Sequence, residues 1–121
     1  MDSKTVLIIE DNEMNMKLVR TLLEIGKYQV LEAADAETGI ELAKKHRPDL
    51  ILMDIQLPAM DGLHATRLIK ADSDTRGIPV VALTSYAMQG DEKKALAAGC
   101  TGYMSKPIDT RQFLKTLSQY L

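Results

Sequence analysis

Short runs of mostly aliphatic residues alternate along the chain with longer stretches in which apolar residues recur every three or four positions. The short runs are typical of buried parallel strands, which we expect at 5–9, 29–32, 50–53, 80–83 and 102–104. The longer stretches have the period of amphipathic helices, which we expect at 12–25, 36–46, 63–71, 91–98 and 110–120.

The first of these helices illustrates how the pattern assigns a buried face. Met14, Leu18, Leu22 and Ile25 recur at helical spacing, so we expect them to face the core. Gly26 follows directly and favours the end of the helix at that point.

Capping and breaking residues support further helix boundaries. Asp35 is a suitable N-cap for the helix at 36–46, and Pro48 favours its end. Gly99 is placed to end the helix at 91–98.

The order of the elements predicts the fold class. Five strands alternating with five helices form βαβ units, which build a parallel sheet through right-handed crossovers. The connections are short, and no repeat, low-complexity segment or linker interrupts them. We therefore expect an α/β fold that forms one compact domain over residues 1–121.

Composition and charge narrow the classes of function. The 121 residues are 45% hydrophobic and 26% charged, which is ordinary for a globular protein. The formal net charge is -2 and no basic block stands out, so we expect no nucleic-acid partner. We find neither a secretory leader nor an apolar run near the roughly 20 residues of a membrane span. A single cysteine cannot form an internal disulfide, so we expect a cytoplasmic protein.

Polar side chains follow the carboxyl ends of four predicted strands. In a parallel α/β sheet these ends meet at the edge where ligands bind. Three carboxylates crowded at that edge repel one another unless a cation neutralises them. In chain order, the polar residues are Glu10, Asp11, Asp54, Thr84, Ser85 and Lys106, the last of which precedes Pro107.

These side chains suit phosphoryl chemistry. Carboxylate oxygens are good ligands for Mg²⁺, and a carboxylate beside the metal can attack a phosphoryl group to form an acyl phosphate. Asp54 is the better nucleophile, because the adjacent Glu10 and Asp11 are suited to holding the metal together. The Lys106 ammonium could neutralise phosphoryl charge, and the Thr84 hydroxyl could donate a hydrogen bond to a phosphoryl oxygen.

Five motifs, in order, resemble the receiver domain of two-component response regulators over essentially the whole chain. They are Glu10-Asp11, Met53-Asp54, Leu57-Pro58 with Met60-Asp61-Gly62, Leu83-Thr84-Ser85, and Lys106-Pro107. The resemblance implies a flavodoxin-like, three-layer αβα sandwich with strand order 2-1-3-4-5. Within the family, the segments 10–17 and 87–91 most resemble the stand-alone, DivK-like regulators.

The resemblance also implies roles for the acidic residues. Asp54 would accept a phosphoryl group from a histidine kinase or a histidine phosphotransferase. Asp11, Asp54 and the backbone carbonyl of Gln56 would bind Mg²⁺, and Glu10 would act mostly through water. Lys106 would pair with the phosphoryl group.

Further residues would carry the response to phosphorylation. The resemblance implies that Thr84 moves toward the phosphate and that Tyr103 swings inward behind it, which biases a two-state element. Ser85 keeps a small residue beside the phosphate. A cis peptide bond is implied before Pro107.

Two side chains are expected to flank the path of a water molecule that attacks the aspartyl phosphate. Gln56 and Tyr86 each lie two residues after a site residue, Asp54 and Thr84 respectively. We hypothesise that these two side chains set the lifetime of the phosphorylated form.

The short tail limits how such a protein could signal. Only residues 107–121 follow Lys106, which leaves room for a final helix and for no output module. We expect a monomer whose phosphorylated form binds a downstream protein through the face made by 91–98, 102–104 and 110–120. Onward phosphotransfer, as a relay intermediate, is the alternative.

Three rival interpretations stay open at this point. A phosphatase working through an aspartyl phosphate usually carries a second Asp where this chain has Gln56, so we expect a phospho-accepting regulator rather than an enzyme. A flavodoxin-like cofactor binder needs a phosphate-binding loop after the first strand, where Glu10 and Asp11 would repel a phosphate. The chain could also be a receiver cut from a hybrid kinase.

Overall fold

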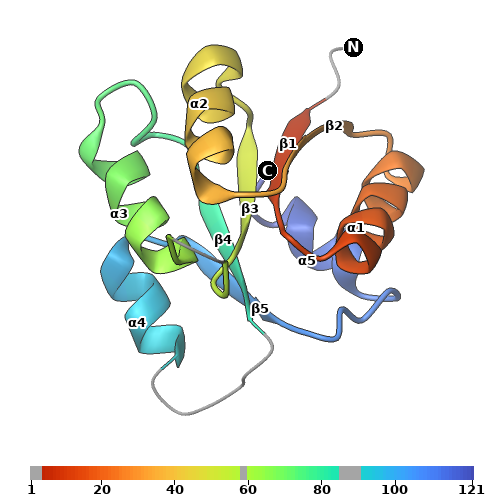
Figure 1. Cartoon of the computed structure of the whole chain (residues 1–121). Helices are drawn as coiled ribbons and strands as arrows, with labels where there is room; N and C mark the ends of the chain where they lie inside the picture. Colours follow the sequence, from red (N-terminus) through yellow and green to blue (C-terminus); the bar gives the residue numbers. More distant parts are fainter. Residues whose placement is uncertain (1–3, 58–59, 85–90) are drawn as a thin grey trace.

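Strands and helices alternate strictly in the computed structural model, which describes residues 4–57, 60–84 and 91–121 (Figure 1). The elements are β1 (Thr5–Ile9), α1 (Glu13–Ile25), β2 (Gln29–Ala33), α2 (Ala36–His46), β3 (Leu50–Asp54), α3 (Gly62–Ala71), β4 (Val80–Thr84), α4 (Asp91–Ala98), β5 (Gly102–Ser105) and α5 (Phe113–Ser118). Their bounds agree with the expected ones to within one residue, apart from α5. That helix is shorter at both ends because turns occupy residues 110–112 and 119–120.

The sheet has the expected topology. All neighbouring strands pair in parallel, in the order β2-β1-β3-β4-β5. Helices α1 and α5 cover one face of the sheet, and α2, α3 and α4 cover the other (Figure 1). The α/β class, the strand order and the three-layer αβα arrangement are therefore confirmed.

The central strands are the most completely buried elements of the fold. In β1, Leu7 and Ile9 face the α2–α4 layer, whereas Val6 and Ile8 face α1 and α5. Every residue of β3 and β4 is buried, as expected for parallel strands with helices on both faces. In the described part of the chain, no helix combines the length and the apolarity that crossing a bilayer requires.

Side-chain caps start three helices soon after the strands that precede them. The side-chain oxygens of Asn12, Asp35 and Asp61 each accept a hydrogen bond from the backbone N–H three residues later, at 2.8–2.9 Å. These bonds satisfy backbone donors that the first helical turn leaves unpaired. The expected cap at Asp35 is confirmed, and the hydrogen bond from Thr38 holds the pKa of that carboxyl below its ordinary value.

Helix α1 buries a different face from the expected one. Met14, Leu18 and Ile25 are 82%, 37% and 66% exposed, so three of the four residues assigned to the core lie at the surface. The helix carries two apolar stripes, and helical periodicity alone does not say which one meets the sheet. The residues of α1 that are buried are Val19, Leu22 and Leu23.

Gly26 ends α1 at the expected place, but the residue that turns the chain is the next one. Lys27 adopts the left-handed conformation, with φ of 65°, and the N–H of Tyr28 donates to the carbonyl of Leu23 at 3.0 Å. This is the hydrogen bond of a Schellman motif, in which glycine usually occupies the left-handed position. Gly26 is needed for packing, since a Cβ atom there would lie 2.7 Å from the Leu114 side chain of α5.

Candidate functional site

The carboxylates of Glu10, Asp11 and Asp54 meet at the carboxyl edge of the sheet. Ile9 of β1 lies beside Met53 of β3 in the strand register, so the acids that follow these residues become neighbours. One carboxylate oxygen from each of the three acids lies within 4.8 Å of the others. The expected convergence of the three acids is therefore present.

Lys106 reaches this cluster from the end of β5. Its ammonium lies 2.6 Å from Oε1 of Glu10 and 3.3 Å from Oδ2 of Asp54. Its backbone N–H donates to the carbonyl of Thr84 at 2.6 Å, and the peptide bond to Pro107 is cis. One cation therefore bridges two carboxylates that would otherwise repel each other.

Asp54 stays ionised although it is only 3% exposed. Burial on its own raises the pKa of this carboxyl, but contacts with Glu10, the Gln56 N–H and Lys106 together lower it below its ordinary value. The Gln56 N–H donates to Oδ1 of Asp54 at 3.0 Å, which also fixes the orientation of the carboxylate. An ionised, oriented carboxylate is the form that a nucleophile requires.

Glu10 is the carboxyl group whose ionisation the cluster disfavours. Burial raises its pKa from 4.5 to about 7, and the neighbouring Asp54 adds to this rise. The Oε2 atom of Glu10 is buried and has no hydrogen-bond partner among the described residues. A divalent cation with its water ligands would satisfy that oxygen and neutralise the cluster, so these residues fit Mg²⁺.

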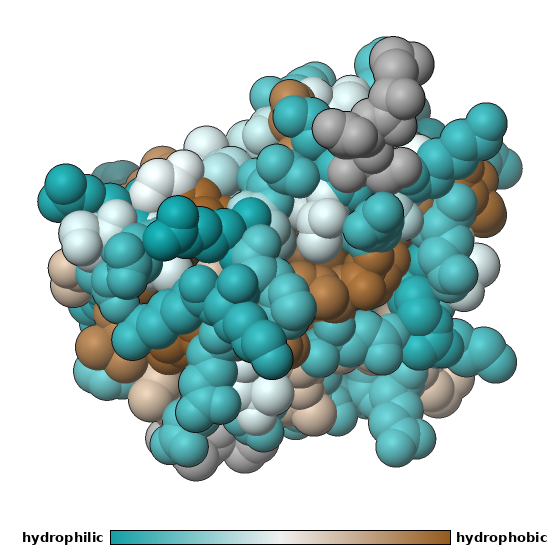
Figure 2. Space-filling model, turned by 90° about the horizontal axis from the view of Figure 1, so that it is seen from above, coloured by the Kyte–Doolittle hydropathy of each residue, from teal (hydrophilic) through white to brown (hydrophobic). Residues whose placement is uncertain are grey.

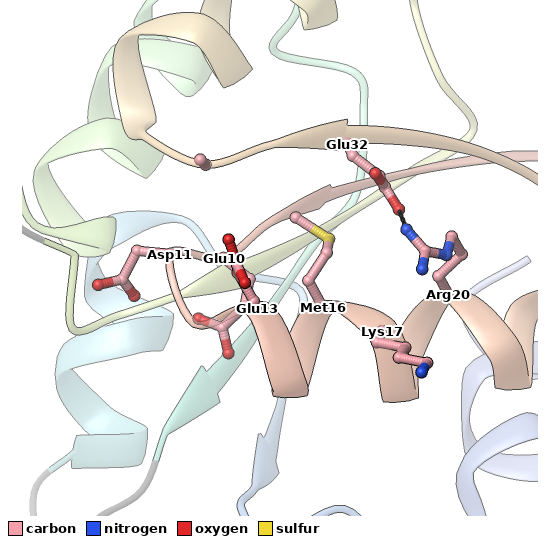
Figure 3. A pocket seen from close by; sticks show the side chains of 8 residues that line it. Glu10, Asp11, Glu13, Met16, Lys17, Arg20 and Glu32 are labelled. Carbon is pink, nitrogen blue, oxygen red and sulfur yellow. Dashed lines mark hydrogen bonds and ion pairs between the residues drawn. The ribbon is translucent and has the colours of Figure 1, made fainter.

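Asp11 completes the acidic set from a more open position. It is exposed, whereas Glu10 and Asp54 are buried. Asp11 and Glu10 lie at one end of a pocket of about 520 Å³ that continues along α1 past Met16 toward Arg20 (Figure 3). The acidic cluster is thus accessible to a reactant from the solvent.

Gly62 supports the site in a way that the sequence reasoning missed. A Cβ atom at this position would collide with the backbone carbonyl oxygen of Asp54 and lie 2.8 Å from Cα of Ile55. The Gly62 N–H donates to the carbonyl of Ile55 at 2.9 Å, so α3 begins directly against the end of β3. The Asp61-Gly62 pair, at the start of a helix that follows an acidic strand end, was the available signal.

The residues expected to respond to phosphorylation lie on β4 and β5. Thr84 is 2% exposed at the carboxyl end of β4, where it lies beside Ser105 in the register. Tyr103 is half-buried and packs against the core cluster on the α2–α4 side. Ser85 and Tyr86 lie outside the described residues.

The single cysteine lies away from the site. Cys100 is buried, with its Sγ 3.8 Å from the Thr66 hydroxyl, and burial raises the pKa of its thiol. This cysteine contributes to the core and lies outside the acidic cluster.

Comparisons with known proteins agree on one family. A family model described as the response regulator receiver domain matches residues 6–118. The polar-differentiation response regulator DivK of Brucella anthropi is 48% identical over 118 residues, which span 98% of this chain and 96% of that protein.

Solved structures match the fold over nearly the whole chain. The receiver domain of the Pseudomonas aeruginosa sensor histidine kinase PA1611, which holds a magnesium ion in its active-site cleft, has a TM-score of 0.90 and 35% identity. The match covers 98% of each chain. The receiver domain of yeast Ssk1, solved with the histidine phosphotransfer protein Ypd1, has a TM-score of 0.89 and 29% identity, covering 98% of this chain and 88% of that one.

Proposed function

Since the chain belongs to the response regulator receiver family of two-component signalling, we propose that Asp54 is its phospho-acceptor. The observation that supports this role most strongly is the bridge from Lys106 to both Asp54 and Glu10 at the carboxyl edge of the sheet. It leaves an ionised carboxylate beside a cation and next to further metal-binding oxygens, as phosphoryl transfer to a carboxylate needs.

The chain's own residues account for the transfer step. An oxygen of Asp54 attacks the phosphorus of a phosphohistidine, and an O–P bond forms while the P–N bond breaks. The electron pair of the broken bond stays on the imidazole nitrogen, which later takes a proton from water. Lys106 releases its carboxylate partners and pairs with a phosphoryl oxygen. Its ammonium charge then neutralises part of the negative charge that the phosphoryl group brings.

Three groups would hold Mg²⁺ directly, namely Asp11, Asp54 and the backbone carbonyl of Gln56. Glu10 would act through a water ligand that reaches its unpaired Oε2 atom. When bound, Mg²⁺ neutralises phosphoryl charge and helps to orient the phosphoryl oxygens.

Phosphorylation changes the positions of the Thr84 and Tyr103 side chains. The Thr84 hydroxyl moves to donate a hydrogen bond to a phosphoryl oxygen, with Ser85 as its small neighbour. Tyr103 then turns further into the core, which it already contacts. The gain of one contact with the phosphate thereby biases the surface formed by α4, β5 and α5 toward a partner-binding state.

The partners follow from the family. Receiver domains interact with histidine kinases and histidine phosphotransferases, and these are the donors we propose here. The α4–β5–α5 surface is the proposed contact for a downstream signalling protein. The protein would act in the cytoplasm as a monomeric, stand-alone regulator, and returning phosphate to a histidine phosphotransferase is the alternative output.

The lifetime of the phosphorylated form is assigned to Gln56 and Tyr86. Both side chains would flank the path of attacking water. Changing both to Ala is expected to alter the rate at which phosphate is lost from purified phosphoprotein, and an unaltered rate would remove this assignment.

Incubation with acetyl phosphate tests the central assignment, with and without Mg²⁺. The parent protein is expected to gain one phosphoryl group only when Mg²⁺ is present, and Asp54→Asn is expected to gain none. Asp74→Asn is the matched control, because Asp74 is an exposed acid whose ion pair with Arg47, at 3.7 Å, lies outside the acidic cluster. Equal labelling of Asp54→Asn and the parent would overturn the proposal.

A further inference from the structure

Two hollows lie next to each other along the outer edge of the sheet, between α1 and β2. The first, of about 520 Å³, begins at Glu10 and Asp11 (Figure 3). The second, of about 730 Å³, follows β2 as far as Tyr28. Arg20 and Glu32 line both hollows, and the 2.7 Å ion pair between them is the boundary. We call the two hollows together the α1–β2 trough.

Among the described residues, the side of β2 that faces the trough has no neighbouring strand with which its backbone groups could pair. In the described part of the chain, β2 pairs with β1 alone. The Gln29 N–H donates to the carbonyl of Lys4 at 2.9 Å, and the Ala33 carbonyl accepts from the N–H that follows β1 at 3.0 Å. Alternate residues of a strand point their backbone groups to opposite sides, so Val30 and Glu32 direct theirs outward.

The two walls of the trough differ in chemistry. Five carboxylates and two basic side chains line the two hollows. One base, Arg20, is already paired with Glu32 at 2.7 Å and lies 3.9 Å from Glu24. On the side of α2, the apolar side chains of Leu31 and Leu42 line the second hollow together with Gln29. Counted over both hollows, carboxylates outnumber basic side chains in the lining of the trough, and the α2 side is mainly aliphatic.

We propose that the α1–β2 trough binds an extended, basic segment of a partner protein, which adds to β2 as a sixth strand. The outward N–H and C=O groups of Val30 and Glu32 would pair with its backbone. Because side chains alternate along a strand, every second residue would face the α1 side, where the basic residues would meet the surplus carboxylates of the trough, and the others would face Leu31 and Leu42. The segment that fits alternates Lys or Arg with aliphatic residues.

Charge decides between this occupant and a second copy of the chain. Two copies paired through β2 would bring a second set of carboxylates against the first, and this repulsion opposes pairing. The Arg20–Glu32 pair offers little resistance to an incoming strand, because its side chains are 41% and 36% exposed and exposed ion pairs contribute little to stability.

The position of the trough would bring the bound partner close to the acidic cluster. Its first hollow ends at the acidic cluster, so a segment that fills both hollows would hold its protein beside Asp11 and Glu13. Binding in the trough does not require phosphorylation of Asp54. The inference therefore stands or falls separately from the proposed function.

Synthetic peptides test the inference with the intact protein. The probe is fluorescein-labelled Lys-Val-Lys-Val-Lys-Val-Lys, titrated in ~0.15 M salt so that non-specific charge attraction is screened. Two variants are N-methylated, one at the valine amides and the other at the lysine amides. Only one edge of an added strand faces β2, so only one of the two methylated peptides is expected to bind at least tenfold more weakly.

Variants of the protein locate the binding. Val30→Pro removes one outward N–H, which an edge strand tolerates, and is expected to weaken binding at least tenfold. Glu24→Lys, on the α1 side of the trough, tests the contribution of charge and is expected to weaken peptide binding at least fivefold. The matched control is Glu41→Lys on α2, since Glu41 is exposed and does not line the trough.

The outcomes separate strand addition from simple charge attraction. Equal binding of both methylated peptides would overturn the inference, as would equal effects of Glu24→Lys and Glu41→Lys. Failure of the unmethylated peptide to bind would overturn it as well. If Val30→Pro does not fold, the peptide pair and the two charge variants still decide the matter.

Discussion

Three charged side chains share one small buried space at the site. Lys106 neutralises one negative charge, while Glu10 and Asp54 together carry two. Burial makes the second negative charge costly, and the pKa of Glu10 rises while that of Asp54 falls. In the metal-free protein, the raised pKa of Glu10 therefore favours its protonated form below about pH 7, while Asp54 stays ionised. Loss of that proton at higher pH costs stability.

Replacing Glu10 by Gln is expected to stabilise the metal-free protein at pH 8 by about 1–3 kcal/mol. The folded-state pKa of about 7 exceeds the ordinary 4.5, so the folded chain binds more protons than the unfolded chain between these values. Stability is therefore lost as pH rises from about 4.5 to about 7, and Gln cannot lose a proton. Urea denaturation from pH 4.5 to 8 with EDTA measures this difference.

Glu13→Gln is the control for that experiment, because Glu13 is an exposed acid on the neighbouring helix. It is expected to leave the pH dependence of the parent unchanged. A Glu10→Gln variant that loses stability at pH 8 would contradict the assigned protonation of the pair.

Gly62→Ala is expected to reduce both stability and phosphorylation. The added methyl group would meet the Asp54 carbonyl oxygen, so the end of β3 or the start of α3 must move. We expect a loss of about 2 kcal/mol or more in urea denaturation, together with slower labelling by acetyl phosphate. Gly77→Ala is the matched control, since nothing lies within 4 Å of a Cβ atom there, and it should change neither quantity.

At the scale of single elements, α1 shows where hydrophobic pattern and structure diverge. Both of its apolar stripes have helical spacing, and the stripe that begins with Met14 is the wrong one to assign to the core. Which stripe is buried depends on how the helix sits on the sheet. One such contact lies at Gly26, where the absence of a Cβ atom allows close approach of Leu114 of α5, and no local pattern encodes a tertiary contact of this kind.

Alanine substitutions on the two faces of α1 check this correction. Leu23→Ala is expected to cost about 2–5 kcal/mol, because Leu23 is fully buried and buried structure usually relaxes only partly around a new cavity. Met14→Ala should change stability by less than about 0.5 kcal/mol. Similar losses of stability for both variants, measured by urea denaturation, would instead support burial of the face that begins with Met14.

The turn after α1 offers a stabilising substitution. Lys27→Gly is expected to raise the free energy of unfolding by about 0.5–1 kcal/mol, since glycine adopts the left-handed conformation without a steric penalty. Gly26→Ala should instead destabilise the protein, because its new methyl group meets Leu114 and Tyr28. Gains or losses of the same sign from both variants would contradict this division of roles.

At the scale of the whole molecule, the sequence predicts the architecture well and the state of the site only in part. Aliphatic runs between amphipathic helices specify a parallel sheet, and a parallel sheet brings the residues after its strands to one edge. That is sufficient to gather Glu10, Asp54 and Lys106. Their distances, the raised pKa of Glu10 and the Oε2 atom without a partner among the described residues depend on burial, which only the folded chain defines.

Locating the phosphoryl group in the chain tests the role of Asp54 directly. After labelling with acetyl phosphate and Mg²⁺, borohydride reduces an aspartyl phosphate to homoserine, which peptide mass spectrometry can place. We expect homoserine at position 54 alone, and none after labelling without Mg²⁺. Homoserine at another acidic position, or a phosphoryl group on His46 or His64, would contradict it.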